Sequence, residues 1–400
     1  MIVLLSGGGT AGHVTPIRTI AREIKQQQPQ ARLFFIGERR TNFSQLLEDA
    51  GIEQSRHIWA GKLRRYHGES WLKRIFDIKT ITLNLRDLFL VSLGTLQAVW
   101  VVRRLKPDVV FLKGGFVGVP VGLAAALWRV PIITHDSDAV AGLANRVVSR
   151  WVNTHATALS PEYYPYDSQR TVQVGVVVAS EYEQVNESLQ QQYRQAIGVG
   201  EAGEVLLISP GSSGSVVINE AVRTLVPKLL EQHPNLYIVH QTGKGKAGIY
   251  QDFHHDRLFV SEFLHPLYQY SGAADVIIMR AGANSLAEFG VQAKACVVIP
   301  SPHLTGGHQL ENAQRLADAK AIAFISQASI EHDAVALEQV VNQLLASPED
   351  RRTLAKNLQK QSATDAAQIV ARLIIETGAN IDQATQQSSS NKQSSSCDEK

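Results

Sequence analysis

Residues 2–26 read IVLLSGGGTAGHVTPIRTIAREIKQ, and residues 205–230 read VLLISPGSSGSVVINEAVRTLVPKLL. Each stretch begins with an apolar run that predicts a buried strand, continues with tiny residues, and ends with apolar residues at helical spacing. Glycines let backbone N–H groups approach an anion, and the helix N-terminus behind them supplies partial positive charge. A strand, loop and helix unit suited to phosphate binding therefore occurs twice. Neither copy is a P-loop, because no Gly-Lys-Ser/Thr follows the glycines.

Strands and helices alternate along the rest of the chain. The other predicted strands are residues 32–36, 109–112, 131–134, 236–240, 276–279 and 295–299. Such alternation is typical of parallel sheets with helical crossovers. The strand-then-helix order restarts after a polar stretch, residues 180–203, so we expect an α/β protein with two doubly wound, Rossmann-like lobes around a cleft. The expected divisions are a first lobe over 1–175, a second over 176–345, a C-terminal helix over 346–377 that packs back on the first lobe, and a disordered polar tail over 378–400.

The composition excludes several classes of protein. A chain of 400 residues with 44% hydrophobic content is long enough for two ordinary domains. The net charge of +2 does not favour nucleic acid as a partner. Two cysteines, Cys296 and Cys397, make neither a disulfide framework nor a cysteine metal site, which fits a reducing compartment. We also expect no secretory signal and no bilayer-spanning segment.

The first glycine loop has two interpretations. Gly7, Gly9 and Gly12 have the Gly-x-Gly-x-x-Gly spacing of a dinucleotide site, and Glu38 follows the next strand, where a ribose-binding acid can lie. Against that interpretation, His13 directly follows the last glycine, and a second glycine loop occurs in the other lobe. A substrate shared between two lobes fits both observations better.

A second polar cluster in the first lobe follows two neighbouring predicted strands. Lys113-Gly114-Gly115 comes after residues 109–112, and the sequence HDSDAVAGLANR occupies residues 135–146. Polar residues at the carboxyl ends of strands lie where open α/β sheets bind ligands. His135, Asp136 and Asp138 favour a hydrogen-bonding set, with a metal site or a cap on the next helix as alternatives.

The second lobe carries two more candidate segments. Residues 275–288, DVIIMRAGANSLAE, predict a strand, a short loop and a helix that carries Glu288. A carboxylate there can accept hydrogen bonds from a ribose diol, or it can serve the helix start. The side chains of His308, Gln309 and Asn312 suit sugar hydroxyls, with a solvated helix start as the alternative.

Together these motifs resemble those of the MurG-type N-acetylglucosaminyltransferases of glycosyltransferase family 28, over about residues 1–375. The most specific parts are Gly7–His13, residues 280–288 and residues 308–313. The resemblance implies a GT-B fold and inverting transfer of N-acetylglucosamine from UDP-N-acetylglucosamine to the C4 hydroxyl of lipid I. Lipid I is an undecaprenyl-diphosphate-linked acceptor, and the product would be lipid II of peptidoglycan synthesis. The resemblance implies no cofactor and no obligatory metal.

The resemblance also implies roles for individual residues. The donor-binding residues would be Gly211, Ser212, Leu264, Arg280, Gly282, Ala283, Glu288, His308, Gln309 and Asn312. The acceptor-binding residues would be Gly8, Gly9, Thr10, Ala11, Gly12, Gly114, Gly115 and Asp138. His13 is the preferred general base, because an unperturbed histidine pKa of about 6.5 suits that task. Asp136 competes for this role, and His13 would then only orient a diphosphate.

Several residues depart from the family pattern. His135-Asp136-Ser137-Asp138 replaces His-Glu-Gln-Asn, Ser213 replaces a glutamine, and Ala179 replaces an arginine. Because of these changes, three alternative functions remain: a family 28 transferase acting on another lipid, a UDP-sugar epimerase, and a membrane-docked UDP-sugar-binding scaffold.

Basic and aromatic residues alternate over residues 59–79. This pattern suits the headgroup boundary of an anionic membrane, although a core-facing helix with a solvated basic face would also produce it. With the family resemblance, we expect this stretch to dock on the cytoplasmic face of the cell membrane as a peripheral contact.

Overall fold

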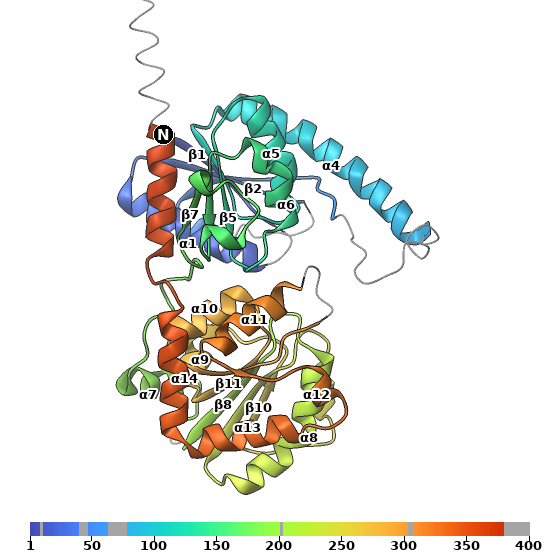
Figure 1. Cartoon of the computed structure of the whole chain (residues 1–400), viewed down its shortest axis with the longest axis vertical. Helices are drawn as coiled ribbons and strands as arrows, with labels where there is room; N and C mark the ends of the chain where they lie inside the picture. Colours follow the sequence, from blue (N-terminus) through green and yellow to red (C-terminus); the bar gives the residue numbers. More distant parts are fainter. Residues whose placement is uncertain (9–10, 40–46, 63–77, 201–202, 303–306, 380–400) are drawn as a thin grey trace, which may run out of the picture. The chain divides into compact units, whose positions relative to one another are not determined.

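The computed structural model describes residues 1–8, 11–39, 47–62, 78–200, 203–302 and 307–379. It forms two compact units, here called the first and second lobes (Figure 1). The first lobe comprises residues 1–177 and the chain from residue 365 onward, and the second comprises residues 178–364. The expected division at 175/176 lies two residues from this boundary.

The first lobe is built on a seven-stranded parallel sheet with the order β3-β2-β1-β4-β5-β6-β7. Its strands are β1 (Ile2–Ser6), β2 (Arg32–Glu38), β3 (Ile52–Ile58), β4 (Val109–Leu112), β5 (Ile132–Asp136), β6 (Thr154–Thr157) and β7 (Thr171–Gln173). Its helices are α1 (Ala11–Gln27), α4 (Ile78–Leu105), α5 (Gly118–Leu127), α6 (Leu143–Val148) and a helix over residues 366–379. Strand order reverses between β1 and β4, which is the topological switch point of a doubly wound sheet.

The second lobe repeats this plan with six strands in the order β10-β9-β8-β11-β12-β13. The strands are β8 (Glu204–Ser209), β9 (Leu236–Gln241), β10 (Leu258–Ser261), β11 (Val276–Met279), β12 (Ala295–Val298) and β13 (Ala323–Phe324). The helices are α7 (Glu187–Ala196), α8 (Val216–Gln232), α9 (Leu267–Ala273), α10 (Ala283–Val291), α11 (His308–Asp318), α12 (Ala328–Glu331), α13 (Val335–Ala346) and α14 (Pro348–Lys360). Its switch point lies between β8 and β11. The expected fold class, two doubly wound α/β lobes, is confirmed.

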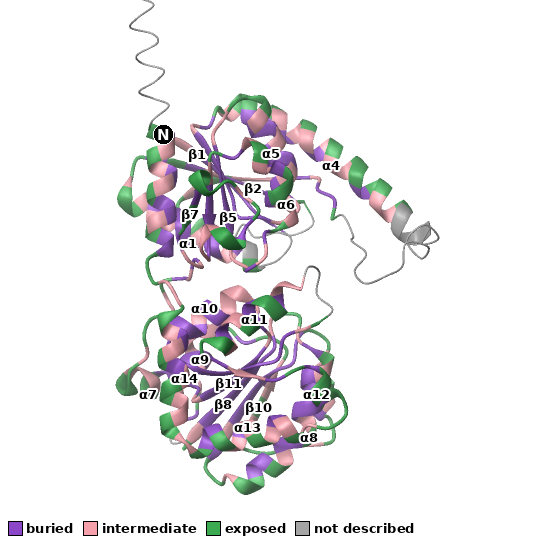
Figure 2. Cartoon of the chain, in the orientation of Figure 1, coloured by how far each residue is buried: buried purple, intermediate pink, exposed green. Residues whose placement is uncertain are grey.

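The buried residues gather on the central strands of each lobe (Figure 2). In β8, Leu206 and Ile208 belong to one core cluster, whereas Val205 and Leu207 belong to a second. Successive side chains of a strand point to opposite faces, so both faces of this sheet are covered. This double burial explains why the central strands are continuous apolar runs rather than alternating ones.

The C-terminal part of the chain differs from the expected single helix over 346–377. Helix α14 ends at Lys360 in the second lobe, and a separate helix begins at residue 366 in the first lobe. The break falls on Gln-Ser-Ala-Thr-Asp, residues 361–365, where short polar side chains compete with helical backbone hydrogen bonds. In the second of these helices the backbone carbonyl of Gln368 accepts a hydrogen bond from Gln27 of α1. The expected tail beyond residue 379 lies outside the described residues.

Helix α4 is long and apolar. Among the described helices it alone has the length and composition needed to cross a bilayer, over Thr82–Leu105. Core helices of water-soluble proteins meet the same criterion, and the C-terminal half of α4 places Ala98, Val101 and Val102 in the core of the first lobe. Its other face stays exposed.

Candidate functional site

The first candidate site lies at the switch point of the first sheet, where β1 and β4 end side by side. Ser6 pairs with Leu112 in the strand register, and the Lys113 amide donates to the Ser6 carbonyl over 2.9 Å. The loops that follow are in backbone contact, because a Cβ added to Gly115 would lie 2.4 Å from the carbonyl oxygen of Gly8. The structure therefore brings together Gly8 and Gly115, which the sequence assigned to one site.

Gly115 also has a backbone conformation that few other residues adopt, with φ +78°. We expect Gly115→Ala to lower the free energy of unfolding by about 2 kcal/mol or more. The cost of holding alanine in a left-handed backbone conformation adds to the cost of the steric overlap with Gly8. Gly248→Ala is the control, since a Cβ there meets nothing within 4 Å. Denaturant unfolding measures both variants. Equal stability of the two would contradict the close contact between the loops.

Asp136 lies at the end of β5 and holds the loop that follows. Its Oδ1 accepts a hydrogen bond from the Gly142 amide at 2.8 Å, and its Oδ2 accepts one from the Tyr166 hydroxyl at 2.8 Å. Gly142 is the N-cap residue of α6 and no side chain caps this helix, so Asp136 fixes the preceding loop rather than acting as the cap. Burial raises the pKa of Asp136 above its usual value, and these hydrogen bonds oppose the shift.

His135 is buried in the same strand end. Its Nε2 lies 3.0 Å from the Gly175 carbonyl oxygen, and burial lowers the pKa of the imidazole well below its usual value. The ring is therefore neutral, and Nε2 carries the proton because a carbonyl can only accept. Within the described ranges no group of three or more His, Cys, Asp or Glu side chains is placed to hold a metal. His135 and Asp136 are therefore hydrogen-bonded within the first lobe, and their role toward a ligand stays a prediction.

Lys113 also belongs to this site, although it is not among the acceptor-binding residues expected from the sequence. Its side chain is buried, and its Nζ donates to Ser137 Oγ over 2.6 Å, which ties the loop after β4 to the loop after β5. Burial lowers the pKa of Lys113 to about 8, and the charges of Asp136 and Asp138 oppose this shift. A lysine directly after a buried strand and before two glycines was the available signal. Asp138 itself is half-buried beside this group, and its backbone carbonyl accepts from Tyr164.

Part of the first loop is not described. Gly9 and Thr10 lie outside the described residues, and so do the side chains of Ala11 and His13. The backbone of His13 is the third residue of α1, and Gly12 beside it is exposed. The expected base therefore belongs to the first turn of the helix that follows β1.

The second candidate site lies at the switch point of the second sheet. Gly211 and Gly214, in the loop after β8, have φ +99° and +65°, and a Cβ on Gly214 would overlap the Thr242 carbonyl. Gln241, the last residue of β9, organises this loop. Its Nε2 donates to the Gly211 carbonyl over 3.1 Å, and its Oε1 accepts from the Leu264 amide over 3.2 Å. One buried amide thus connects Gly211 and Leu264, and the sequence did not single it out.

Arg280 joins three strand ends of the second lobe. Its Nη2 donates to Ser215 Oγ over 2.7 Å, and its Nη1 donates to the Ile299 carbonyl over 3.0 Å. Ser215 is the N-cap of α8 and accepts from the Ile218 amide. A guanidinium therefore lies at the N-terminus of α8, where the helix dipole also favours an anion. Ser212 lies exposed in the same loop.

Glu288 lies in the second turn of α10 and does not cap it. The N-cap is Gly282, and no side chain caps it there, so the alternative role at the helix start is wrong. Although the residue keeps some exposed surface, its carboxyl group is largely enclosed, and this desolvation raises its pKa to about 7. The Tyr182 hydroxyl donates to the carboxyl group and partly offsets that rise. Tyr182 was not among the candidate residues.

Helix α11 packs on the same edge. The Asn312 amide donates to the Ala281 carbonyl over 3.2 Å, next to Gly282 and Ala283 at the start of α10. Gln309 is buried, and its Oε1 accepts from the Ser301 amide over 2.9 Å. His308 is the first residue of α11. The structure therefore connects α11 with the loops after β11 and β12.

The chain matches two family models. Residues 3–157 match the glycosyltransferase family 28 N-terminal domain, and residues 205–370 match the glycosyltransferase family 28 C-terminal domain. Two similar curated proteins are named UDP-N-acetylglucosamine–N-acetylmuramyl-(pentapeptide) pyrophosphoryl-undecaprenol N-acetylglucosamine transferase. The protein from Symbiobacterium thermophilum is 30% identical, covering 94% of this chain and 96% of the relative. The protein from Lachnospira eligens is 32% identical, covering 93% of this chain and 98% of the relative.

Solved structures share the fold. The crystal structure of Acinetobacter baumannii MurG superposes with a TM-score of 0.69 at 25% identity, covering 94% of this chain and 99% of that one. A UDP-GlcNAc 2-epimerase from Neisseria meningitidis bound to UDP-GlcNAc superposes with a TM-score of 0.63 at 14% identity, covering 94% and 100%. The second likeness concerns the fold alone.

Proposed function

The chain belongs to glycosyltransferase family 28, and from that premise we propose that it transfers N-acetylglucosamine from UDP-N-acetylglucosamine to the C4 hydroxyl of lipid I, forming lipid II. The observation that carries the proposal is the edge of the second sheet, where the guanidinium of Arg280, the N-terminus of α8 and the enclosed carboxyl group of Glu288 lie on the segments that follow β8 and β11. These groups match the diphosphate and ribose of a UDP-sugar.

The donor lies on the second lobe in this account. Its diphosphate takes hydrogen bonds from the backbone of Gly211 and Ser212, with Arg280 and the α8 N-terminus stabilising the charge. Glu288 accepts from the ribose hydroxyls. Leu264 faces the uracil, while His308, Gln309 and Asn312 face the sugar. In this scheme the donor needs no metal, because Arg280 and the N-terminus of α8 balance the negative charge of the diphosphate.

The reaction is a direct displacement at the anomeric carbon. The acceptor C4 oxygen forms a bond to C1 as the bond from C1 to the diphosphate oxygen breaks, and the configuration at C1 inverts. A base takes the proton of the C4 hydroxyl, and UDP leaves as the anion that the second lobe stabilises. We assign His13 as the base, because both carboxylate oxygens of Asp136 already accept hydrogen bonds from the first lobe.

The charge state of Glu288 makes donor binding depend on pH. With a pKa of about 7 the carboxyl is neutral below that pH and ionised above it, and only the ionised form accepts hydrogen bonds from both ribose hydroxyls. We expect the affinity for UDP-N-acetylglucosamine to rise about tenfold between about pH 6 and about pH 8, measured by calorimetry.

Two variants check that assignment. Glu288→Gln cannot ionise and should show no such step. Tyr182→Phe removes a hydrogen bond to the ionised form, so the midpoint should move to higher pH. If the change in donor affinity between about pH 6 and about pH 8 persists in Glu288→Gln, the titrating group is not Glu288.

The acceptor is bound by a lobe that we propose docks on the cytoplasmic face of the cell membrane. Most of the expected docking stretch, residues 63–77, lies outside the described residues, and α4 begins directly after it. Five apolar side chains on one side of α4 are more than half exposed: Leu85, Leu88, Phe89, Leu96 and Trp100. An exposed apolar stripe flanked by arginines supports peripheral binding to a membrane surface.

A second lipid acceptor is the rival that one observation favours. Asp138 stands where the family pattern has an amide, and the buried Lys113 beside it adds a charge to the acceptor edge. UDP release from UDP-N-acetylglucosamine, measured with a lipid I analogue, with diacylglycerol and with no acceptor, separates the possibilities. Release that needs the lipid I analogue supports the proposal, whereas release with diacylglycerol favours the rival. Release without lipid would indicate hydrolysis or epimerisation.

A further inference from the structure

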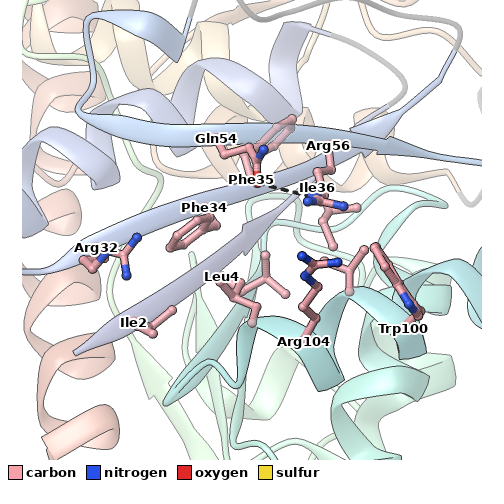
Figure 3. A pocket seen from close by; sticks show the side chains of 12 residues that line it. Ile2, Leu4, Arg32, Phe34, Phe35, Ile36, Gln54, Arg56, Trp100 and Arg104 are labelled. Carbon is pink, nitrogen blue, oxygen red and sulfur yellow. Dashed lines mark hydrogen bonds between the residues drawn. The ribbon is translucent and has the colours of Figure 1, made fainter.

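A pocket lies on the first lobe between α4 and strands β1, β2 and β3 (Figure 3). We call it the Trp100 pocket; its volume is about 260 Å³. The lining residues are Ile2, Leu4, Arg32, Phe34, Phe35, Ile36, Gln54, Arg56, Trp100, Val101, Arg104 and Leu105. None of the residues assigned to the donor or the acceptor is among them.

The pocket has an apolar floor and a basic rim. Leu4, Ile36 and Val101 are buried at its base, whereas Arg56 and Arg104 reach it from β3 and from α4. Figure 3 shows the two guanidinium groups close together beside the ring of Trp100. A ligand that fits both parts has an anionic group and an apolar chain.

The rim carries positive charge that the surrounding side chains do not neutralise. Arg32 is paired with Glu53 at 2.8 Å. Arg56 and Arg104 instead stack on the same indole, 5.5 and 5.4 Å from its centroid, and neither forms an ion pair with a described carboxylate. None of the lining residues is acidic. Two guanidinium groups gathered on one ring are best stabilised by an anion between them, and guanidinium matches phosphate oxygens in geometry.

Trp100 also connects the pocket with the exposed apolar stripe of α4. Leu96 and Trp100 belong to that stripe, and Trp100 forms one wall of the pocket. A molecule whose phosphate lies at the rim can therefore continue along an apolar surface. This continuity favours a lipid over a free inorganic anion or a polar metabolite.

We propose that the Trp100 pocket binds the headgroup phosphate of an anionic phospholipid. The guanidinium groups of Arg56 and Arg104 hold the phosphate, and the floor formed by Leu4, Ile36 and Val101 takes the adjoining part of an acyl chain. The inference rests on the proposed docking of this lobe at a membrane, and it assigns a specific lipid contact to it. Such a site adds a preference for anionic lipid to apolar insertion.

A monomeric short-chain lipid tests the pocket without the general attraction of a charged membrane surface. Dihexanoyl phosphatidylglycerol, dihexanoyl phosphatidylcholine and inorganic phosphate are titrated separately into the full-length protein, and binding is followed by calorimetry. We expect phosphatidylglycerol to bind at least about tenfold more tightly than either of the others. If both lipids bind equally tightly, the charge of the headgroup plays no part in binding. If inorganic phosphate binds as tightly as phosphatidylglycerol, the pocket is a site for free anions. Either result would overturn the proposal.

Neighbouring arginines provide a matched control. Arg103→Gln and Arg104→Gln each remove one charge from the same turn of α4, and each side chain stacks on a tryptophan at 5.4 Å. Only Arg104 lines the pocket. We expect Arg104→Gln and Arg56→Gln each to weaken phosphatidylglycerol binding about tenfold, and Arg103→Gln to change it less than twofold. Equal losses in Arg103→Gln and Arg104→Gln would show general electrostatics and overturn the site.

Two further measurements keep the outcomes separate. Thermal unfolding of each variant identifies one that fails to fold, in which case the remaining arginine variant decides. UDP release by the wild-type protein with a short-chain lipid I analogue is measured in parallel. Activity without phosphatidylglycerol binding would overturn only the proposed lipid site. Phosphatidylglycerol binding without activity would overturn only the proposed transferase function.

Discussion

His13→Ala is expected to lower kcat by about a thousandfold, because a positioned general base contributes roughly this much to proton transfer. His13 belongs to the first turn of α1. A general base at this position takes the proton of the C4 hydroxyl as the new bond forms. Binding of UDP-N-acetylglucosamine should be unchanged, since the donor groups lie on the other lobe. Initial rates and calorimetry measure the two quantities.

Two control variants distinguish the loss of a general base from other effects of substitution. His254→Ala, at an exposed histidine of the second lobe, should leave kcat unchanged. Asp136→Asn should reduce stability by about 2 kcal/mol, because it places an amide between two hydrogen-bond donors, while kcat falls less than in His13→Ala. If His13→Ala keeps kcat within tenfold and Asp136→Asn abolishes it, the base is Asp136.

Glu288→Ala is expected to lower kcat/KM for UDP-N-acetylglucosamine by about a hundredfold or more. The carboxylate would accept two hydrogen bonds from the ribose, and each such charged hydrogen bond contributes roughly 1.5 kcal/mol or more. The KM for the lipid acceptor should change little, because the acceptor residues belong to the first lobe. Initial-rate kinetics with each substrate varied in turn measure both effects.

The control for Glu288→Ala is Glu349→Ala, which removes an exposed carboxylate of the same lobe in the first turn of α14. It should leave kcat/KM unchanged. A value within threefold of wild type in Glu288→Ala would mean that the ribose is recognised elsewhere.

The central strands of both sheets could be predicted from the sequence, whereas the peripheral ones could not. Strands such as β1, β4, β8 and β11 are buried on both faces and therefore appear as continuous apolar runs. The edge strands have weaker patterns: β3 reads IEQSRHI, with five exposed or half-exposed polar residues in succession, and β13 has two residues. A strand that packs on one face, or that is very short, leaves too few apolar positions to be recognised.

The glycine loops were predicted for a similar reason. A backbone with positive φ at a strand end selects glycine, as at Gly115 and Gly211, so the requirement is visible in the residue type. Tyr182 and Gln241 were missed, and Lys113 was noted in a polar cluster but given no role, because their contacts depend on partners distant in the chain. Tyr182, for example, reaches Glu288 only through the fold of the second lobe. The roles assigned to the donor and acceptor residues stay predictions that the variants above test.

The proposed transfer is tested most directly by the structure of the product formed from UDP-α-N-acetylglucosamine and a soluble lipid I analogue. Nuclear magnetic resonance of the isolated lipid product reports both the linkage and the anomeric configuration. We expect one N-acetylglucosamine joined through its C1 to the C4 oxygen of the muramoyl unit in the β configuration, with one UDP released per product. An α linkage, transfer to another hydroxyl, or free N-acetylglucosamine in place of a lipid product would contradict it.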